Sequence, residues 1–512
     1  MYALRFAGAI SLLFRATAPT AQFLALLASL TACQVENLAP SRPEPRSGMA
    51  ERPVASAAGR PNIVVIMTDD QTVESMRVMP QTRDLIGSAG VTFDNNMVTY
   101  ALCCPSRATF LTGQYPHNHG VRSNAPPDGG HTKLDHSNTL PLWLQGAGYV
   151  TGHIGKYLNG YGQVDTLEIP PGWTEWYAGT GGSEYRYYDY RLNENGTVVS
   201  YRATPEDYQS DVYTGKALDF IHRRAPDAVA GTTPFFLFVT YLAPHAGGPV
   251  EPGDPTLGTP VPAPRHKGRF AGELLPATPA FNEADMSDKP ASMRSRASLT
   301  PTQVSEIREA YRQRLESLLA VDEGVARIIG ALQDDGVLDN TLVIFTSDNG
   351  FFQGEHRLSS GKILPYEPAV KVPLLIRGPG AAPGHRVSAL VANIDLAPTI
   401  VEVAGATAGR TMDGRSLSPF LSGGQATWLV GPRHVLVEDS PRGTAKTVFW
   451  SIKRGKYVYT EYANGNRELY DLATDSAQVT SRHASSTYAK VRGQLAARLA
   501  AMKTCSGPTA CW

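Results

Sequence analysis

The chain has 512 residues, of which 42% are hydrophobic and 18% are charged, so it is long enough for a substantial core and more than one domain. Its 47 basic and 47 acidic side chains give a formal net charge of +0. This balance argues against a nucleic-acid-binding protein, which normally carries a basic excess, so any anion must be recognised by a few placed residues.

The N-terminal segment has the pattern of an export signal. An apolar run, "FLALLASLTAC", ends at Leu30–Cys33 and is shorter than the ~20 residues that a membrane span requires. We therefore expect a signal peptide over 1–33 and export to a bacterial periplasm or cell envelope. Its last four residues resemble a lipobox, in which Cys33 is lipidated; an ordinary cleaved secretory peptide is the alternative. Residues 34–60, rich in Pro, Ser, Ala and charge, predict a flexible linker.

Three continuous apolar runs, each followed by polar residues, predict strands that are buried on both faces. The runs are "NIVVIMT", "PFFLFVTYLAP" and "NTLVIFTS". The polar residues that follow them are Asp69 and Asp70, then His245, then Asp348 and Asn349. Helical patterns between the runs indicate an α/β fold with a mostly parallel sheet. Ligands bind beyond the carboxyl ends of such strands, so we expect these five residues to share one site.

Other segments complete the expected architecture. Thr300 and Gln303 form a capping box that opens a long helix, and Ala246–Ser298 predicts a surface loop. Asn195-Gly196 predicts a hairpin turn. Short strands and a final helix follow, which predicts a small α+β domain over 413–512 after a catalytic domain over 61–412.

The polar residues at the strand ends also predict a metal site. Asp69, Asp70, Asp348 and Asn349 offer only oxygen ligands, which suit Ca²⁺ or Mg²⁺ far better than zinc. Each pair alone is more often a helix cap or a turn, so the prediction depends on their shared position.

Five cysteines must be accounted for in an oxidising compartment. Cys33 belongs to the export segment, and Cys505 and Cys511 are close enough to form a small disulfide loop. Cys103 and Cys104 remain, with no further sulfur to pair with them.

The stretch "CCPSRATFLTG" fits the sulfatase signature Cys-x-Pro-Ser-Arg, with Cys103 at its first position. Six further blocks resemble the same family in the same order: "VIMTDDQ", "GHIGKYLNGYG", "YLAPHAG", "FTSDNG", "GEHRLSSGKILPYE" and "KVPLLIRGPG". The chain is most similar to the N-acetylglucosamine-6-sulfatase branch, with which it shares "CCPSR", "PHNH", "GKYLNGYG" and "CSGPT". The resemblance implies an alkaline-phosphatase-like fold, in which helices sandwich a large mixed, mostly parallel sheet.

In that family the signature cysteine is oxidised to formylglycine by a formylglycine-generating enzyme. This enzyme recognises a cysteine, a proline and an arginine at a fixed spacing. Cys103, Pro105 and Arg107 supply this spacing, whereas reading from Cys104 places Ser106 where proline is needed. The hydrated aldehyde would then be a metal ligand and the nucleophile, with a second hydroxyl to expel sulfate. Cys104 is expected to be a packing residue.

The resemblance also implies roles for polar residues. Arg107 supports the hydrated aldehyde, and Lys156 and Lys362 bind the sulfate or the leaving oxygen. His245 protonates the departing alcohol as general acid, and His356 is a candidate substrate contact. Many sulfatases carry a histidine where this chain has Leu158, and Asn159 is the candidate replacement.

The leading interpretation is a sulfuric ester hydrolase acting on a sulfated sugar, such as the N-acetylglucosamine-6-sulfate groups of glycosaminoglycans. One alternative is a phosphodiester or phosphonate monoester hydrolase of the same superfamily. Another is a non-catalytic lipoprotein that binds sulfated glycans. No nucleic-acid partner is expected, and contact with a membrane is expected only through a lipid anchor.

Overall fold

The computed structural model describes residues 59–424, 432–439 and 448–512. The predicted signal peptide, Cys33 and nearly all of the predicted linker lie outside these residues. Among the described residues, no helix combines the length and the apolar character that crossing a membrane requires.

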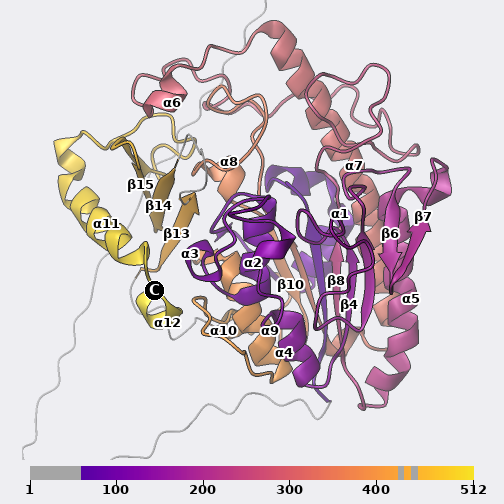
Figure 1. Cartoon of the computed structure of the whole chain (residues 1–512). Coiled ribbons are helices and arrows are strands. Elements are labelled where there is room, and N and C mark those ends of the chain that lie inside the picture. The colour runs from indigo at the N-terminus through magenta and orange to yellow at the C-terminus, as the bar shows by residue number, and fades with distance from the viewer. Residues whose placement is uncertain (1–58, 425–431, 440–447) are drawn as a thin grey trace, which may run out of the picture. The chain divides into compact units, whose positions relative to one another are not determined.

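A ten-stranded mixed sheet forms the centre of the fold, in the order β11-β2-β10-β9-β1-β8-β4-β5-β6-β7 (Figure 1). Its strands are β1 (Asn62–Thr68), β2 (Val91–Phe93), β4 (Val150–Gly155), β5 (Glu175–Gly179), β6 (Arg191–Glu194), β7 (Thr197–Ser200), β8 (Phe235–Thr240), β9 (Thr341–Ser347), β10 (Leu374–Arg377) and β11 (His385–Val387). Strands β9, β1, β8, β4 and β5 run parallel to one another. The predicted mostly parallel sheet is therefore confirmed.

Helices cover both faces of this sheet because its strand residues alternate between two apolar clusters. Val64 and Ile66 of β1 pack in one cluster with helices α5 (Gln209–Val229) and α7 (Pro301–Asp334). Ile63, Val65 and Met67 pack in the other cluster, with helices α2 (Cys103–Thr112), α4 (Leu140–Gly146) and α9 (Leu396–Ala404). The result is the predicted three-layer sandwich.

Several local predictions are confirmed. Helix α7 begins with the capping box of Thr300 and Gln303, and β6 and β7 form the hairpin around Asn195-Gly196. The loop over 246–298, all of which the structure describes, contains only the short helix α6 (Ala291–Arg294). Strand β8, in contrast, ends at Thr240, well before His245, because the chain turns there and the His245 amide donates to the Leu242 carbonyl at 2.9 Å.

A separate antiparallel sheet lies near the C-terminus, as the short strands predicted. It consists of β13 (His434–Asp439), β14 (Phe449–Arg454), β15 (Tyr457–Tyr462) and β16 (Arg467–Asp471), and helix α11 (Ala489–Met502) packs against it. The predicted disulfide between Cys505 and Cys511 is present. The domain boundary at residue 413 falls between α9 and α10 (Ser418–Leu421) and stays a prediction.

The remaining short elements connect these layers. They are β3 (Asn96–Met97), β12 (Val391–Ala392), α1 (Pro80–Thr82), α3 (Pro116–His119), α8 (Glu367–Val370) and α12 (Gly507–Ala510).

Candidate active site at the ends of the central strands

The two central strands bring four predicted ligand residues to one edge of the sheet. Strands β1 and β9 pair in parallel with Thr68 opposite Ser347, so the residues that follow each strand become neighbours. The Asp70 amide donates to Asp348 Oδ1 at 3.1 Å, and Asn349 Nδ2 donates to Asp70 Oδ1 at 2.6 Å. All of these side chains are buried.

Cys103 reaches this edge because it is the first residue of helix α2. Pro105 lies in the first turn, where a missing amide hydrogen is tolerated. Arg107, four residues after Cys103, lies on the same face of the helix as Cys103. Cys103 Sγ lies 3.5 Å from Asp69 Oδ1 and 2.8 Å from Lys362 Nζ. The positive end of the helix therefore faces the carboxylates and stabilises negative charge that develops at position 103.

Arg107 and Lys156 hold the carboxylates in a buried ionic network. Arg107 Nε donates to Asp348 Oδ2 at 2.8 Å and its Nη2 donates to Asp69 Oδ2 at 3.1 Å. Lys156, the first residue after β4, pairs with the same Asp69 oxygen. Burial raises the pKa of Asp69, but the charges of Lys156, His245 and Arg107 outweigh it and hold the pKa well below its ordinary value. Asp69 is therefore ionised.

Lys362 and His245 form the more accessible side of the cluster, with 11% and 20% of their side chains exposed. Lys362 pairs with Asp70. Burial lowers the pKa of Lys362, but Asp70 and Cys103 reverse this, and the net pKa lies above its ordinary value. Burial lowers the pKa of His245 to about 4, against the opposing charges of Asp69 and Asp70.

The imidazole of His245 has a defined orientation. Its Nδ1 donates to the Ala246 carbonyl at 2.6 Å, and its Nε2 lies 3.6 Å from Asp70 Oδ2. Nε2 is therefore the nitrogen that faces the cluster and can exchange a proton there.

The residues present fit a divalent cation. Ligand atoms of Asp69, Asp70, Cys103 and His245 lie within 4.8 Å of one another. Asn349 Oδ1 is buried and has no hydrogen-bond partner among the described residues, which is costly unless a further group binds it. Carboxylate and amide oxygens favour a hard cation. Asp348 borders this group, and its role as a ligand stays a prediction.

The two neighbouring cysteines lie in different surroundings. Burial, followed by the charge of Asp69, raises the pKa of the Cys103 thiol to about 12. Cys104 is fully buried in the apolar cluster of β1 and α2, as expected of a packing residue. The unmodified Cys103 thiol is therefore protonated at neutral pH and a poor nucleophile.

Tyr185 is a site residue that the sequence did not distinguish from the other tyrosines of its segment. Lys156 Nζ lies 4.4 Å from the centre of its ring, and the ring lies 4.9 Å from that of His245. Asn159 Nδ2 donates to the Tyr185 hydroxyl, so the predicted polar contact of Asn159 is made to the protein. Tyr185 thus forms an aromatic wall beside the two residues.

Arg314 of α7 was also missed. Its guanidinium is buried and donates to the Asp70 carbonyl and, at 2.9 Å, to the Pro244 carbonyl. It also lies 4.3 Å from the centre of the Phe351 ring. No carboxylate pairs with it in the part of the chain that the structure describes. Arg314 therefore fixes the two backbone segments that carry Asp70 and His245.

We expect Arg314→Leu to lower the free energy of unfolding by about 1–3 kcal/mol, because two buried carbonyls lose their donor. Urea denaturation measures the change. The matched control is Arg327→Leu, since Arg327 is exposed on the same helix and should change stability by less than about 0.5 kcal/mol. Equal losses in the two variants would contradict this role.

His356 is fully buried, and its Nδ1 bonds Glu283 Oε2 at 2.6 Å. Its ring lies 4.2 Å from that of Tyr366. These contacts are internal, so its predicted contact with substrate stays a prediction.

Comparisons with known proteins agree over most of the chain. Residues 61–406 match the family model described as Sulfatase, and residues 354–505 match the model described as N-sulphoglucosamine sulphohydrolase, C-terminal. The N-acetylglucosamine-6-sulfatase of Homo sapiens is 34% identical over 505 residues, which cover 89% of this chain and 87% of that protein. A putative extracellular sulfatase Sulf-1 homolog of Caenorhabditis elegans is 37% identical over 361 residues, covering 70% of this chain and 48% of that protein.

Among solved structures, one was determined in complex with its substrate, D-glucosamine-2-N,6-O-disulfate. It is 26% identical to this chain, with a TM-score of 0.70, and the match covers 86% of this chain and 97% of that one.

Proposed function

This chain belongs to the sulfatase family, and from that membership we propose that it removes 6-O-sulfate from N-acetylglucosamine-type residues of glycosaminoglycans. Membership makes it a sulfuric ester hydrolase. The observation that carries the proposal is the cluster in which Cys103 meets Asp69, Lys156 and Lys362 at the strand ends. The human relative and the substrate-bound structure support the choice of sugar.

We assign the nucleophile to position 103. A formylglycine-generating enzyme would oxidise Cys103, whose sulfur marks where the hydroxyls of the hydrated aldehyde lie. That group supplies an oxygen nucleophile and a second hydroxyl that allows sulfate to leave. Lys362 Nζ, 2.8 Å from the sulfur, is placed to stabilise charge on this oxygen.

The proposed cation is Ca²⁺, with Mg²⁺ as the alternative, held by Asp69, Asp70, Asp348 and Asn349 together with position 103. When bound, the cation supplies charge stabilisation for a nucleophilic oxygen and for sulfate. The three carboxylates of the site are already balanced by Arg107, Lys156 and Lys362. A divalent cation therefore leaves a positive excess that suits an anionic ester.

The remaining residues bind the sulfate and move a proton. Lys156 and Lys362 contact the sulfuryl oxygens, while Arg107 keeps the carboxylates and position 103 in place. His245 donates a proton from Nε2 to the departing sugar oxygen, which leaves as a hydroxyl, and the incoming anion favours the imidazolium form of His245.

We also propose that the protein is exported, by a signal peptide over 1–33, and that Cys33 carries a lipid anchor. Extracellular sulfatases among the relatives support export. The residues assigned to the site lie within the proposed catalytic domain, 61–412, and 413–512 forms the smaller domain.

The substrate is tested with purified, formylglycine-containing protein and a panel of monosulfated sugars. Sulfate release should give the highest kcat/KM with N-acetylglucosamine-6-sulfate, above its 3-sulfated isomer and N-acetylgalactosamine-6-sulfate. A chromogenic phosphodiester serves as the comparison, at the same pH. A higher kcat/KM for the phosphodiester would contradict the proposal and favour the alternative hydrolase.

Removal of the cation should abolish activity. A chelator is expected to lower kcat by at least about 10²-fold, because positive charge at the reacting sulfate is lost. Titration with Ca²⁺ and with Mg²⁺ separately should restore sulfate release, and the lower half-saturating concentration identifies the preferred cation. Full activity after exhaustive chelation, with no metal found by elemental analysis, would contradict a metal-dependent site.

A further inference from the structure

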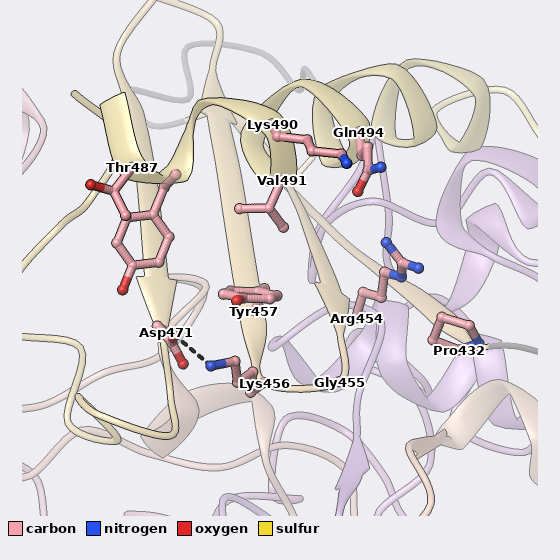
Figure 2. A pocket seen from close by; sticks show the side chains of 11 residues that line it. Pro432, Arg454, Gly455, Lys456, Tyr457, Asp471, Thr487, Lys490, Val491 and Gln494 are labelled. Atoms are coloured by element: carbon pink, nitrogen blue, oxygen red, sulfur yellow. Dashed lines mark hydrogen bonds and ion pairs between the residues drawn. The ribbon is translucent and has the colours of Figure 1, made fainter. Parts of the chain in front are cut away.

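A cleft in the C-terminal sheet lies apart from the active site and has its own chemistry (Figure 2). It encloses about 730 Å³ between the β14–β15 turn and the start of α11. This volume is within the range of sites that bind small organic ligands, roughly 300–1,000 Å³.

The cleft is basic although the chain as a whole is neutral. Arg454, Lys456 and Lys490 line it, and Asp471 is the acidic residue in its wall. Asp471 pairs with Lys456 at 2.8 Å, as the dashed line in Figure 2 shows. Arg454 and Lys490 form no ion pair with any residue that the structure describes. Two positive charges are therefore available to an anion.

Uncharged groups in the cleft suit a sugar. Tyr457 lines the cleft below α11 in Figure 2, with Lys456 Nζ 5.0 Å from the centre of its ring, and a pyranose that stacks on this ring would lie beside that cation. Gln494 and Thr487 add hydrogen-bonding groups for hydroxyls. A concave site with an aromatic ring, amide and hydroxyl groups and unpaired cations matches a sulfated sugar better than a flat membrane surface.

The cleft and the active site lie at opposite ends of the small sheet. Arg454 pairs with His434 at one end of β13, and Phe449 pairs with Asp439 at the other. Asp439 accepts a hydrogen bond from Tyr100, which lies three residues before Cys103. The length of the six-residue strand β14, about 17 Å, therefore separates the cleft from the end of the sheet that contacts Tyr100.

We propose that this cleft is a second binding site for sulfated polysaccharide, which holds the polymer while another part of it occupies the active site. The proposal rests on the proposed function, since its ligand is the polymer that carries the substrate. Two-point binding raises the affinity for long chains and leaves the reaction of a monosaccharide unchanged.

The test compares Arg454→Glu/Lys490→Glu with wild type, using heparin as the sulfated polymer and the full chain. The double variant should bind heparin about tenfold more weakly and elute from a heparin column at lower salt, because exposed cations supply the attraction. KM for a sulfated polymer should rise by a similar factor, with kcat/KM for a monosaccharide substrate unchanged. The control is Arg327→Glu, a single charge reversal on α7 to set beside Arg454→Glu and Lys490→Glu made one at a time, and it should behave as wild type.

Tyr457→Ala separates stacking from charge, and we expect it to weaken heparin binding with little change in the salt dependence. Equal heparin affinity for wild type and the double variant would overturn the proposal. Tighter binding of wild type to anionic lipid vesicles than to heparin would also overturn it, in favour of a membrane surface. Heparin binding is measured without turnover, so loss of the predicted sulfatase activity alone contradicts the proposed function and not the cleft.

Discussion

Cys103→Ser is expected to lower the steady-state rate of sulfate release by more than about 10³-fold. A serine at position 103 keeps one oxygen near Lys362 and Asp69. It has no second hydroxyl on the same carbon, so a sulfate transferred to it cannot be expelled by collapse to an aldehyde. The variant should therefore stop at a sulfated adduct, which mass spectrometry detects as added mass on that peptide.

The matched control is Cys104→Ala. Cys104 is buried in the apolar cluster of β1 and α2, so its truncation should reduce stability and leave kcat/KM unchanged. Repeated turnover by Cys103→Ser at the wild-type rate would contradict the assigned nucleophile. Loss of turnover in a normally folded Cys104→Ala variant would show that the chemistry had been assigned to the wrong sulfur.

Asp69→Asn is expected to have the second large effect, lowering kcat/KM by about 10³-fold or more. The substitution keeps the shape of the side chain but removes the charge shared by Lys156 and Arg107. It also removes a proposed ligand of the cation, so calorimetry should show weaker Ca²⁺ binding. Two buried cations lose a partner, which should lower the free energy of unfolding by about 3–5 kcal/mol.

Asp322→Asn is the control for stability alone. Asp322 is buried on α7, where it accepts hydrogen bonds from the amides of Gln81 and Thr82. Its substitution should destabilise the fold but leave kcat/KM of the folded protein unchanged. If both variants lose kcat/KM equally, the effect of Asp69→Asn comes from folding and its assigned role is wrong.

The sheet could be predicted because the sequences of its central strands are continuous apolar runs. Ile63–Met67 alternates between two buried faces, and no polar residue interrupts it. The end of β8 was harder to predict, because Tyr241 to Ala243 stay apolar and buried after the strand has ended at Thr240. Hydrophobicity reports burial, and a buried loop has the same composition as a buried strand.

The residues of the candidate site also fall into those that the sequence predicted and those that it did not. Asp69, Asp348 and Cys103 could be predicted because strand ends and a family signature mark them. Arg314 could not, because it lies in a helix with many charged residues and resembles a solvent-facing arginine until tertiary packing buries it. Tyr185 was obscured by the other tyrosines of its segment, of which Tyr187 is fully buried.

The most direct test of the account is the mass of the peptide that contains position 103, measured on active protein produced with a formylglycine-generating enzyme. We predict a peptide lighter than the unmodified one by a sulfur and two hydrogens, with one oxygen gained. The fraction of modified peptide should rise in proportion to the rate of sulfate release across preparations. An active preparation whose peptide retains an unmodified Cys103 would contradict the account.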